Sequence, residues 1–151
     1  MRAMLRYRIS ETINVPLRYA YEWLTDFRDD DTTIIGGPYP RHILRKRKDG
    51  FVWIQRYKRE GVEKEGVRII TLKPPNGWHN EAINEEKESS FDYRLTPAGR
   101  NRTKLTISAK ITYKTIEPEV KAQLERSLSA DWQKYKAALE KDYSSGKAAT
   151  A

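Results

Sequence analysis

The residues best suited to acid–base chemistry are one histidine, one glutamate and one tyrosine, which lie in three different predicted strands. His42 and Tyr57 belong to the two strands of a predicted hairpin, and Glu11 lies in the first predicted strand. A histidine close to such partners could exchange protons with a substrate during an enolisation or a cyclisation. A histidine with a purely structural hydrogen bond is the commoner outcome. The catalytic residues are therefore unknown, and these three are candidates only.

Other kinds of reactive site are excluded or disfavoured by the composition. The chain has no cysteine, which excludes disulfides, a thiol nucleophile and cysteine-ligated metals. Its two histidines, His42 and His79, fall on opposite predicted faces of their strands, so a shared metal site is not expected. No zinc-binding His-Glu-x-x-His, P-loop, dinucleotide fingerprint or nucleophile elbow is present. We predict neither a metal nor a cofactor.

The stretch RKRKDGFVWIQRYKR, residues 45–59, mixes basic and aromatic residues in a way that raises the question of nucleic acid. Asp49-Gly50 is typical of a two-residue hairpin turn, and that turn places His42 opposite Tyr57. The aromatic residues then share one face of the hairpin, and most arginines share the other. A single-strand binding site needs aromatic and cationic groups along one groove. The pattern therefore favours an inward aromatic face and a solvent-facing arginine face.

The charge balance admits an anionic partner without requiring one. The formal net charge is +8, the isoelectric point is near 9.6, and a third of the residues are charged with both signs represented. Solubility and surface ion pairing explain such a composition better than nucleic-acid binding. The first ten residues lack an apolar leader, and no stretch approaches the ~20 apolar residues of a membrane span. We expect a cytoplasmic protein without membrane insertion, and the sequence leaves open whether it is a monomer or a dimer.

Hydrophobic periodicity predicts an α+β domain of strands closed by a long helix. Residues 4–15 alternate apolar and polar side chains as in a half-buried strand, and Pro16 then opens a short amphipathic helix that ends near Leu24. A second short helix is predicted near Asp29–Asp31. Six further strands are predicted at 41–48, 51–59, 65–73, 78–86, 90–97 and 102–114. A helix of about 26 residues follows, starting near Pro118. One domain over residues 1–145 and a flexible tail at 146–151 account for the chain.

Polar residues at inward positions predict a ligand cavity. Glu11 lies in the inward phase of the first strand, His42 and Gln55 lie on the aromatic face of the hairpin, and Ser127 and Asp131 adjoin the apolar stripe of the last helix. The strands predicted at 65–73 and 78–86 are expected to share one inward face, which carries Val67, Ile69, Thr71, Trp78, Asn80, Ala82 and Asn84. Apolar walls with a few convergent polar groups are usual for a small-molecule site. The predicted ligand-binding residues are Tyr7, Ile9, Glu11, His42, Leu44, Trp53, Gln55, Tyr57, Ile69, Thr71, Trp78, Asn80, Ala82, Tyr93, Ile107, Ala109, Leu124, Ser127, Leu128, Asp131 and Tyr135.

The order of these elements resembles that of the SRPBCC superfamily, the START-like and Bet v 1-like group that includes polyketide cyclase/dehydrase-like proteins. The resemblance rests on INVPLRYAYEWLTD at residues 13–26 and LERSLSADWQKYKAALEKDY at residues 124–143, and it extends over about residues 4–143. It implies a helix-grip fold, in which a curved seven-stranded antiparallel sheet wraps around a long C-terminal helix, with two short helices between the first and second strands.

The resemblance also implies a binding function. SRPBCC proteins bind lipids, sterols, plant hormones or polyketides in a cavity between the sheet and the helix, and some are enzymes. We therefore expect an apolar or amphipathic small-molecule ligand that is lipid-, sterol- or polyketide-like. A cyclase- or hydrolase-like enzyme that uses the same cavity is one alternative. An interaction module that uses the basic outer face is another.

Overall fold

The computed structural model describes residues 3–26, 42–113 and 118–146 of the chain, and the side chains at 3, 42–44, 57–59 and 118–125 lie outside that description. Its strands are β1 (Ala3–Ile13), β2 (His42–Arg47), β3 (Gly50–Arg59), β4 (Val62–Lys73), β5 (Gly77–Ile83), β6 (Lys87–Gly99) and β7 (Arg102–Tyr113). Its helices are α1 (Leu17–Leu24) and α2 (Pro118–Ser144). All predicted strands and the long helix are confirmed. The second short helix predicted near Asp29–Asp31 falls outside the described residues.

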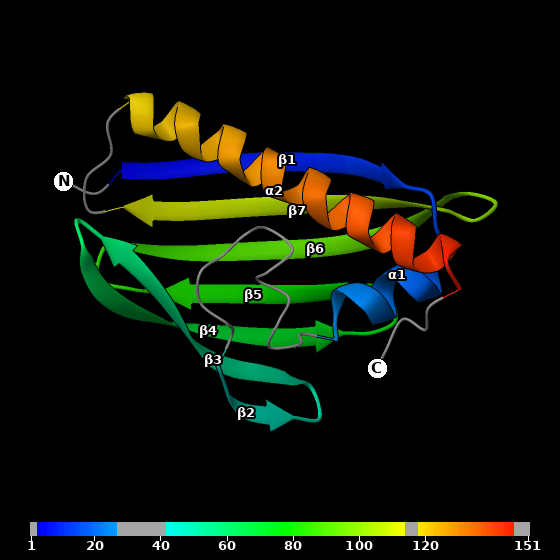
Figure 1. Cartoon of the computed structure of the whole chain (residues 1–151), viewed down its shortest axis with the longest axis horizontal. Coiled ribbons are helices and arrows are strands. Elements are labelled where there is room, and N and C mark those ends of the chain that lie inside the picture. The colour runs from blue at the N-terminus through cyan, green and yellow to red at the C-terminus, as the bar shows by residue number, and fades with distance from the viewer. Residues whose placement is uncertain (1–2, 27–41, 114–117, 147–151) are drawn as a thin grey trace.

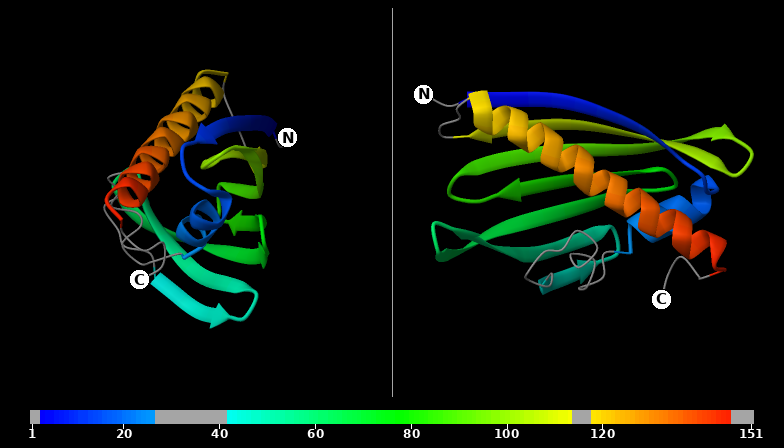
Figure 2. Two further views of the ribbon diagram at one scale, coloured as in Figure 1. Left: turned by 90° about the vertical axis from the view of Figure 1, so that its right-hand side faces the viewer. Right: turned by 45° about the horizontal axis from the view of Figure 1, so that its top comes forward.

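The seven strands form one antiparallel sheet in the order β1-β7-β6-β5-β4-β3-β2 (Figure 1). Strands β2 to β7 lie side by side in the order in which they follow one another in the sequence, so they form a meander. β1 pairs with β7 at the far end of this meander. Figure 2 shows the sheet curving around α2, which runs diagonally from the β1 edge towards α1. The helix-grip architecture expected from the sequence is therefore confirmed.

The buried apolar side chains of the sheet gather on one face, because successive side chains of a strand point to opposite faces. β7 shows this most clearly, since Leu105, Ile107, Ala109 and Ile111 are buried while Lys104 and Lys110 are exposed. The register carries the same face to the neighbouring strands, for example from Ile9 through Ile107 to Tyr93. We call this concave, helix-covered side the inner face and the opposite side the outer face.

The C-terminal half of α2 holds the helix on the inner face. Leu139 is fully buried, and Leu128, Trp132 and Tyr135 pack against the core from the preceding turns. Trp23 of α1 donates a hydrogen bond from Nε1 to Asp142 Oδ2 at 2.8 Å, which ties the two helices together.

The β2–β3 turn differs from the prediction. The turn residues are Lys48 and Asp49, and Gly50 is already in β3, where it pairs with Arg47 and Thr71. A Cβ on residue 50 would lie 1.8 Å from the carbonyl oxygen of Ile70, so the glycine lets two backbones approach. Each residue of β2 next to the turn now pairs with the β3 residue two positions before the predicted one. A change of two positions keeps each side chain on its predicted face, and Phe51 and Trp53 are buried as predicted.

Two further predictions of strand pairing are wrong, one between β2 and β3 and one between β4 and β5. The shifted turn and a bulge between Ile43 and Arg45 together make His42 pair with Ile54 instead of Tyr57. Because Ile54 is an outer-face position, the register does not place His42 on the aromatic face, contrary to the prediction.

The β4–β5 turn also contains one residue fewer than expected, because Gly77 pairs with Lys73 as part of β5. Trp78 and Asn80 therefore pair with Leu72 and Ile70. Since a slip of one residue moves a strand's side chains to the other face, Ile69 and Thr71 lie on the outer face, not on the inner face as predicted.

The burial of Leu139 predicts that α2 depends on this residue for its attachment. Leu139→Ala should lower the free energy of unfolding by about 2–5 kcal/mol, because it leaves a cavity where the helix meets the sheet. Leu128→Ala, which truncates a half-buried leucine of the same helix, is the matched control and should cost clearly less. Equal losses in chemical denaturation would contradict the anchoring role of Leu139.

The close backbone approach at Gly50 predicts that even a methyl group is not tolerated there. Gly50→Ala should lower the free energy of unfolding by at least about 1–3 kcal/mol, since β3 or β4 must move to relieve the overlap. Asp49→Ala, at the neighbouring exposed turn position, should change it by no more than about 0.5 kcal/mol. A fully stable Gly50→Ala protein would show that the two strands can separate freely.

Candidate functional site

An aromatic cluster, defined as Trp78, Phe91, Tyr93, Trp132 and Tyr135, joins the inner face to α2. The rings of Trp78 and Tyr93 are stacked with centroids 4.6 Å apart, and those of Tyr93 and Trp132 lie 5.7 Å apart. Trp132 and Tyr135 follow at 5.3 Å along the helix, and Phe91 lies 6.2 Å from Tyr93 on the sheet. Rings at such spacings pack favourably against one another, and Trp78 and Phe91 are almost fully buried, so the cluster forms part of the core between the sheet and α2.

A polar network, defined as Gln55, Arg68, Asn80 and Tyr93, begins inside that cluster and leads to the neighbouring strands. Asn80 is only 6% exposed and hydrogen-bonds to the Tyr93 side chain. Arg68 donates to Asn80 Oδ1 from Nη1 at 3.3 Å and to Gln55 Oε1 from Nε. Two neutral amide oxygens therefore fix the plane of one guanidinium group on an otherwise apolar face.

The tyrosine hydroxyls on the inner face lie in a low-dielectric environment. Burial raises the pKa of Tyr93 to about 12. The positive charge of Arg68 lowers this pKa, the nearby Tyr135 raises it, and the hydrogen bond from Asn80 lowers it. Burial, with smaller contributions from Tyr93 and Tyr113, also raises the pKa of Tyr7. The buried Tyr7 hydroxyl has no hydrogen-bond partner among the described residues. Leaving such a group unsatisfied costs about 1–3 kcal/mol, so a polar ligand group near Tyr7 would gain from pairing with it.

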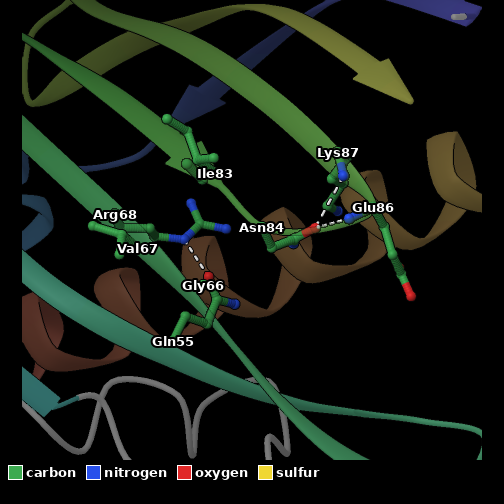
Figure 3. Close-up of a pocket in the computed structure, with 9 residues that line it drawn as sticks. Gln55, Gly66, Val67, Arg68, Ile83, Asn84, Glu86 and Lys87 are labelled. Atoms are coloured by element: carbon green, nitrogen blue, oxygen red, sulfur yellow. Dashed lines mark hydrogen bonds between the residues drawn. The ribbon is translucent and has the colours of Figure 1, made fainter. Parts of the chain in front are cut away.

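The guanidinium of Arg68 lines a pocket of about 160 Å³ (Figure 3). The pocket lies where β5 turns into β6, at the end of the sheet where α2 begins (Figure 1). Its lining is Gln55, Gly66, Val67, Arg68, Ala82, Ile83, Asn84, Glu86 and Lys87.

Two of the polar residues lining the pocket have structural roles. Asn84 Oδ1 accepts hydrogen bonds from the backbone N–H groups of Glu86 and Lys87 at 2.8 and 3.0 Å, so this side chain closes the β5–β6 turn. The Lys87 ammonium lies over the Tyr113 ring, 5.7 Å from its centroid. Arg68 is therefore the pocket residue best placed to present N–H donors to a ligand.

Most of the predicted ligand-binding residues with described side chains occupy inner-face positions or the core-facing side of α2. They are Tyr7, Ile9, Glu11, Trp53, Gln55, Trp78, Asn80, Ala82, Tyr93, Ile107, Ala109, Leu128 and Tyr135. Ser127 is exposed, and Asp131 is half-buried with a pKa raised by burial against the opposing charge of Lys134. The side chains of His42, Leu44, Tyr57 and Leu124 lie outside the described part of the chain.

The sequence interpretation missed Arg68 and Phe91. Both alternate with apolar or aromatic residues on the inner face, and the correct β4 register would have revealed Arg68.

The predicted acid–base residues are not brought together by the topology. Glu11 is on β1 and His42 on β2, which are the two edges of the sheet. Glu11 instead accepts a hydrogen bond from Gln133 Nε2 of α2 at 2.6 Å. Within the described residues, no group of three histidine, aspartate or glutamate side chains is arranged to hold a metal ion. No described helix is long and apolar enough to cross a membrane.

Comparisons with known proteins identify the fold. No protein-family model and no curated protein matches the sequence. Solved structures do match. The Zhui aromatase/cyclase of a Streptomyces species has a TM-score of 0.73 at 14% identity, over 93% of both chains. A START superfamily protein from Mycobacterium smegmatis has a TM-score of 0.67 at 12% identity, over 89% of this chain and 97% of the other. Norcoclaurine synthase from Thalictrum flavum has a TM-score of 0.66 at 10% identity, over 93% of this chain and 86% of the other. The chain therefore has the same fold as these solved structures, the helix-grip fold that the sequence resemblance implied.

The raised pKa of Tyr93 predicts a loss of stability in alkali. Its folded pKa of about 12 lies above the ordinary value of 10.0, so its contribution is complete below pH 10 and is lost as the pH rises through 12. Two pKa units correspond to about 3 kcal/mol at most. Tyr93→Phe should flatten the fall in unfolding free energy over this range, measured by denaturation at a series of pH values. Identical slopes in both proteins would contradict the buried environment of this hydroxyl.

Proposed function

We propose that this protein binds a flat apolar small molecule that carries an anionic or strongly hydrogen-bond-accepting group. Its apolar part would contact the aromatic cluster, and its acceptor would pair with Arg68. The observation that carries the proposal is the position of Arg68, which lines a pocket and is linked through Asn80 to Tyr93 within the cluster. Lipid-, sterol- and polyketide-like compounds remain the ligand classes expected from the sequence.

The preset orientation of the guanidinium supports an anionic partner. A guanidinium group presents planar N–H donors that suit carboxylate and other oxyanions. Because Gln55 and Asn80 already hold Arg68 in place, little side-chain freedom would be lost on binding. In a partly dehydrated pocket the attraction is also stronger than it would be in water.

The size of the pocket indicates which part of a ligand it would accept. Small-molecule sites usually enclose about 300–1,000 Å³, whereas the pocket beside Arg68 measures about 160 Å³. This space suits one polar end of a ligand and is too small for a complete lipid or polyketide. The aromatic cluster, reached through Asn80, is the neighbouring surface for the remainder.

Cyclase-like catalysis is a second candidate, and the link from Arg68 through Asn80 to a protonated Tyr93 favours it. A cation could stabilise the negative charge on the oxygen of a bound carbonyl compound in its enolate form, and a tyrosine that stays neutral up to high pH could donate a hydrogen bond to the same oxygen. The solved Zhui protein is named an aromatase/cyclase. If this chain is an enzyme, Tyr93→Phe should abolish turnover of an accepted compound and leave its affinity largely unchanged.

The expected cytoplasmic location stays a prediction.

The binding proposal can be tested with two fluorescent probes that differ in charge. Anilinonaphthalene sulfonate is an aromatic anion, and N-phenylnaphthylamine is the corresponding neutral compound. Arg68→Gln should weaken the affinity for the sulfonate probe by about ten-fold or more, because a hydrogen bond to a charged group contributes about 1.5–3 kcal/mol. The neutral probe should bind the variant and the parent protein with similar affinity.

Arg56→Gln is the matched control, since Arg56 lies on neighbouring β3 but is exposed and paired with Glu65. It should change the affinity for neither probe. If Arg68→Gln and Arg56→Gln weaken the sulfonate equally, the anion binds through general surface charge and the assignment of Arg68 is wrong.

A further inference from the structure

The outer face carries an apolar patch at the β3–β4–β5 end of the sheet, away from α2. We define the outer patch as Val52, Ile54, Val67, Ile69 and Ile83. Val67 and Ile83 are 43% and 54% exposed and pair directly with each other. Val52 pairs with Ile69 and Ile54 with Val67, so the five side chains form one contiguous block. A contiguous aliphatic block on a sheet surface is typical of an interaction site.

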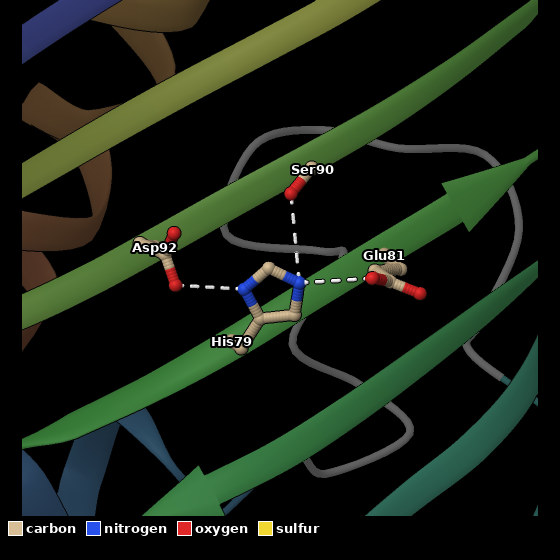
Figure 4. Close-up of polar contacts among 4 residues, drawn as sticks. All are labelled: His79, Glu81, Ser90 and Asp92. Carbon is tan, nitrogen blue, oxygen red and sulfur yellow. Dashed lines mark hydrogen bonds and ion pairs between the residues drawn. The ribbon is translucent and has the colours of Figure 1, made fainter.

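Charges of opposite sign flank the outer patch. On its β2 side are the exposed Arg45 and Arg47, which pair with Val52 and Gly50. On its β5–β6 side are the carboxylates of Glu81 and Asp92, which hold His79 between them (Figure 4). His79 Nδ1 lies 2.7 Å from Asp92 Oδ1, and Nε2 lies 3.2 Å from Glu81 Oε1. One edge of the patch is therefore cationic and the other is rich in carboxylates.

The strand register makes this surface complementary to itself. The row Arg45–Val52–Ile69–Glu81 crosses β2, β3, β4 and β5 in order. A two-fold axis parallel to the strands and passing between β3 and β4 exchanges the two halves of this row. In a back-to-back pair, Val52 of each copy then faces Ile69 of the other, and Arg45 faces Glu81. The next rows match as well, because Ile54 faces Val67 and Arg56 faces Glu65.

We propose that the outer patch is the interface through which two copies of this chain associate back to back. Such a pair is isologous and closed, since each copy contributes the same residues. Two sheets packed face to face in this way lie about 10 Å apart, with strands within about 30° of each other. The aromatic cluster stays free in both copies, because it lies on the inner face, and Arg68 also belongs to that face. Val67 and Ile83 line both the pocket and the outer patch, so the dimer would cover their outer side only.

The mixed charge favours a second copy over a uniformly anionic partner. A nucleic acid or an anionic membrane would attract Arg45 and Arg47 but would be repelled by Glu81 and Asp92. The outer patch also carries no aromatic side chain on which bases could stack. A second copy satisfies both edges at once, because it presents carboxylates to the arginines and arginines to the carboxylates.

The interface is small, so the association is expected to be weak. Five aliphatic and a few charged side chains per copy place it at or below the ~1,200 Å² lower limit of standard interfaces. The monomer–dimer equilibrium should therefore lie in the micromolar range or weaker, and it should be visible only at elevated protein concentration.

Sedimentation velocity over a series of concentrations, on the full chain, tests the proposal. The parent protein should dimerise. Arg45→Glu and Glu81→Arg should each raise the dissociation constant about ten-fold, because two like-charge contacts replace two favourable ones. The double variant should return to within about three-fold of the parent, since the charges are exchanged and the pairing is restored. Ile83→Lys should also abolish the dimer.

Met4→Lys is the matched control, because Met4 is 52% exposed on the outer face of β1, outside the proposed interface. It should leave dimerisation unchanged. A chain that stays monomeric at every concentration would overturn the proposal. So would a dimer that the double charge exchange fails to rescue. A monomer that instead co-sediments with phosphatidylserine-containing vesicles would overturn it too, and would assign the outer patch to a membrane.

Discussion

The two-residue period of the antiparallel sheet is the constraint on which the rest of this structure depends. Seven paired strands send alternate side chains to a single inner face, and that face is too apolar to meet water. It needs one cover, which α2 provides through a stripe ending at the fully buried Leu139. The hydrogen bond from Thr103 Oγ1 to the backbone oxygen of Val15, at 2.8 Å, fixes the segment that leads from β1 into α1 at the same end of the sheet. The position of every candidate functional residue follows from this arrangement.

The candidate site is the place where the inner face departs from the apolar rule. A core designed only for stability would not place a guanidinium, an amide and several phenol groups there, because each must find a partner or be penalised. Asn80 and Gln55 each accept one hydrogen bond from Arg68, whereas the Tyr7 hydroxyl stays unsatisfied within the described residues. A surplus of buried polar capacity beside stacked aromatic rings is what a ligand with one polar group would use. The outer face breaks the opposite rule, since it leaves aliphatic residues in water at Val67 and Ile83.

The sequence predicted the fold well because strand alternation and the long helix are properties of many residues together. It predicted the site less well because faces depend on single residues at the turns. Gly50 and Gly77 read as turn residues, yet both belong to strands in which a neighbouring backbone comes close. In β4, Ile69 and Ile70 are adjacent isoleucines, so the apolar pattern fits either phase, and the one-residue error at Gly77 hid Arg68. The bulge that shifts His42 has no signal in composition at all.

In the proposed complex, Arg68, held by Gln55 and Asn80, binds the polar group of an aromatic ligand on the inner face. A nitrogen–proton correlation spectrum recorded during titration with anilinonaphthalene sulfonate tests it most directly. The Arg68 Nε–H signal and the side-chain amide signals of Asn80 and Gln55 should shift together and saturate at one concentration of the probe. Signals of outer-face residues such as Arg45 and His79 should stay in place. Shifts confined to those outer residues, with the Arg68 and Asn80 signals unmoved, would contradict it.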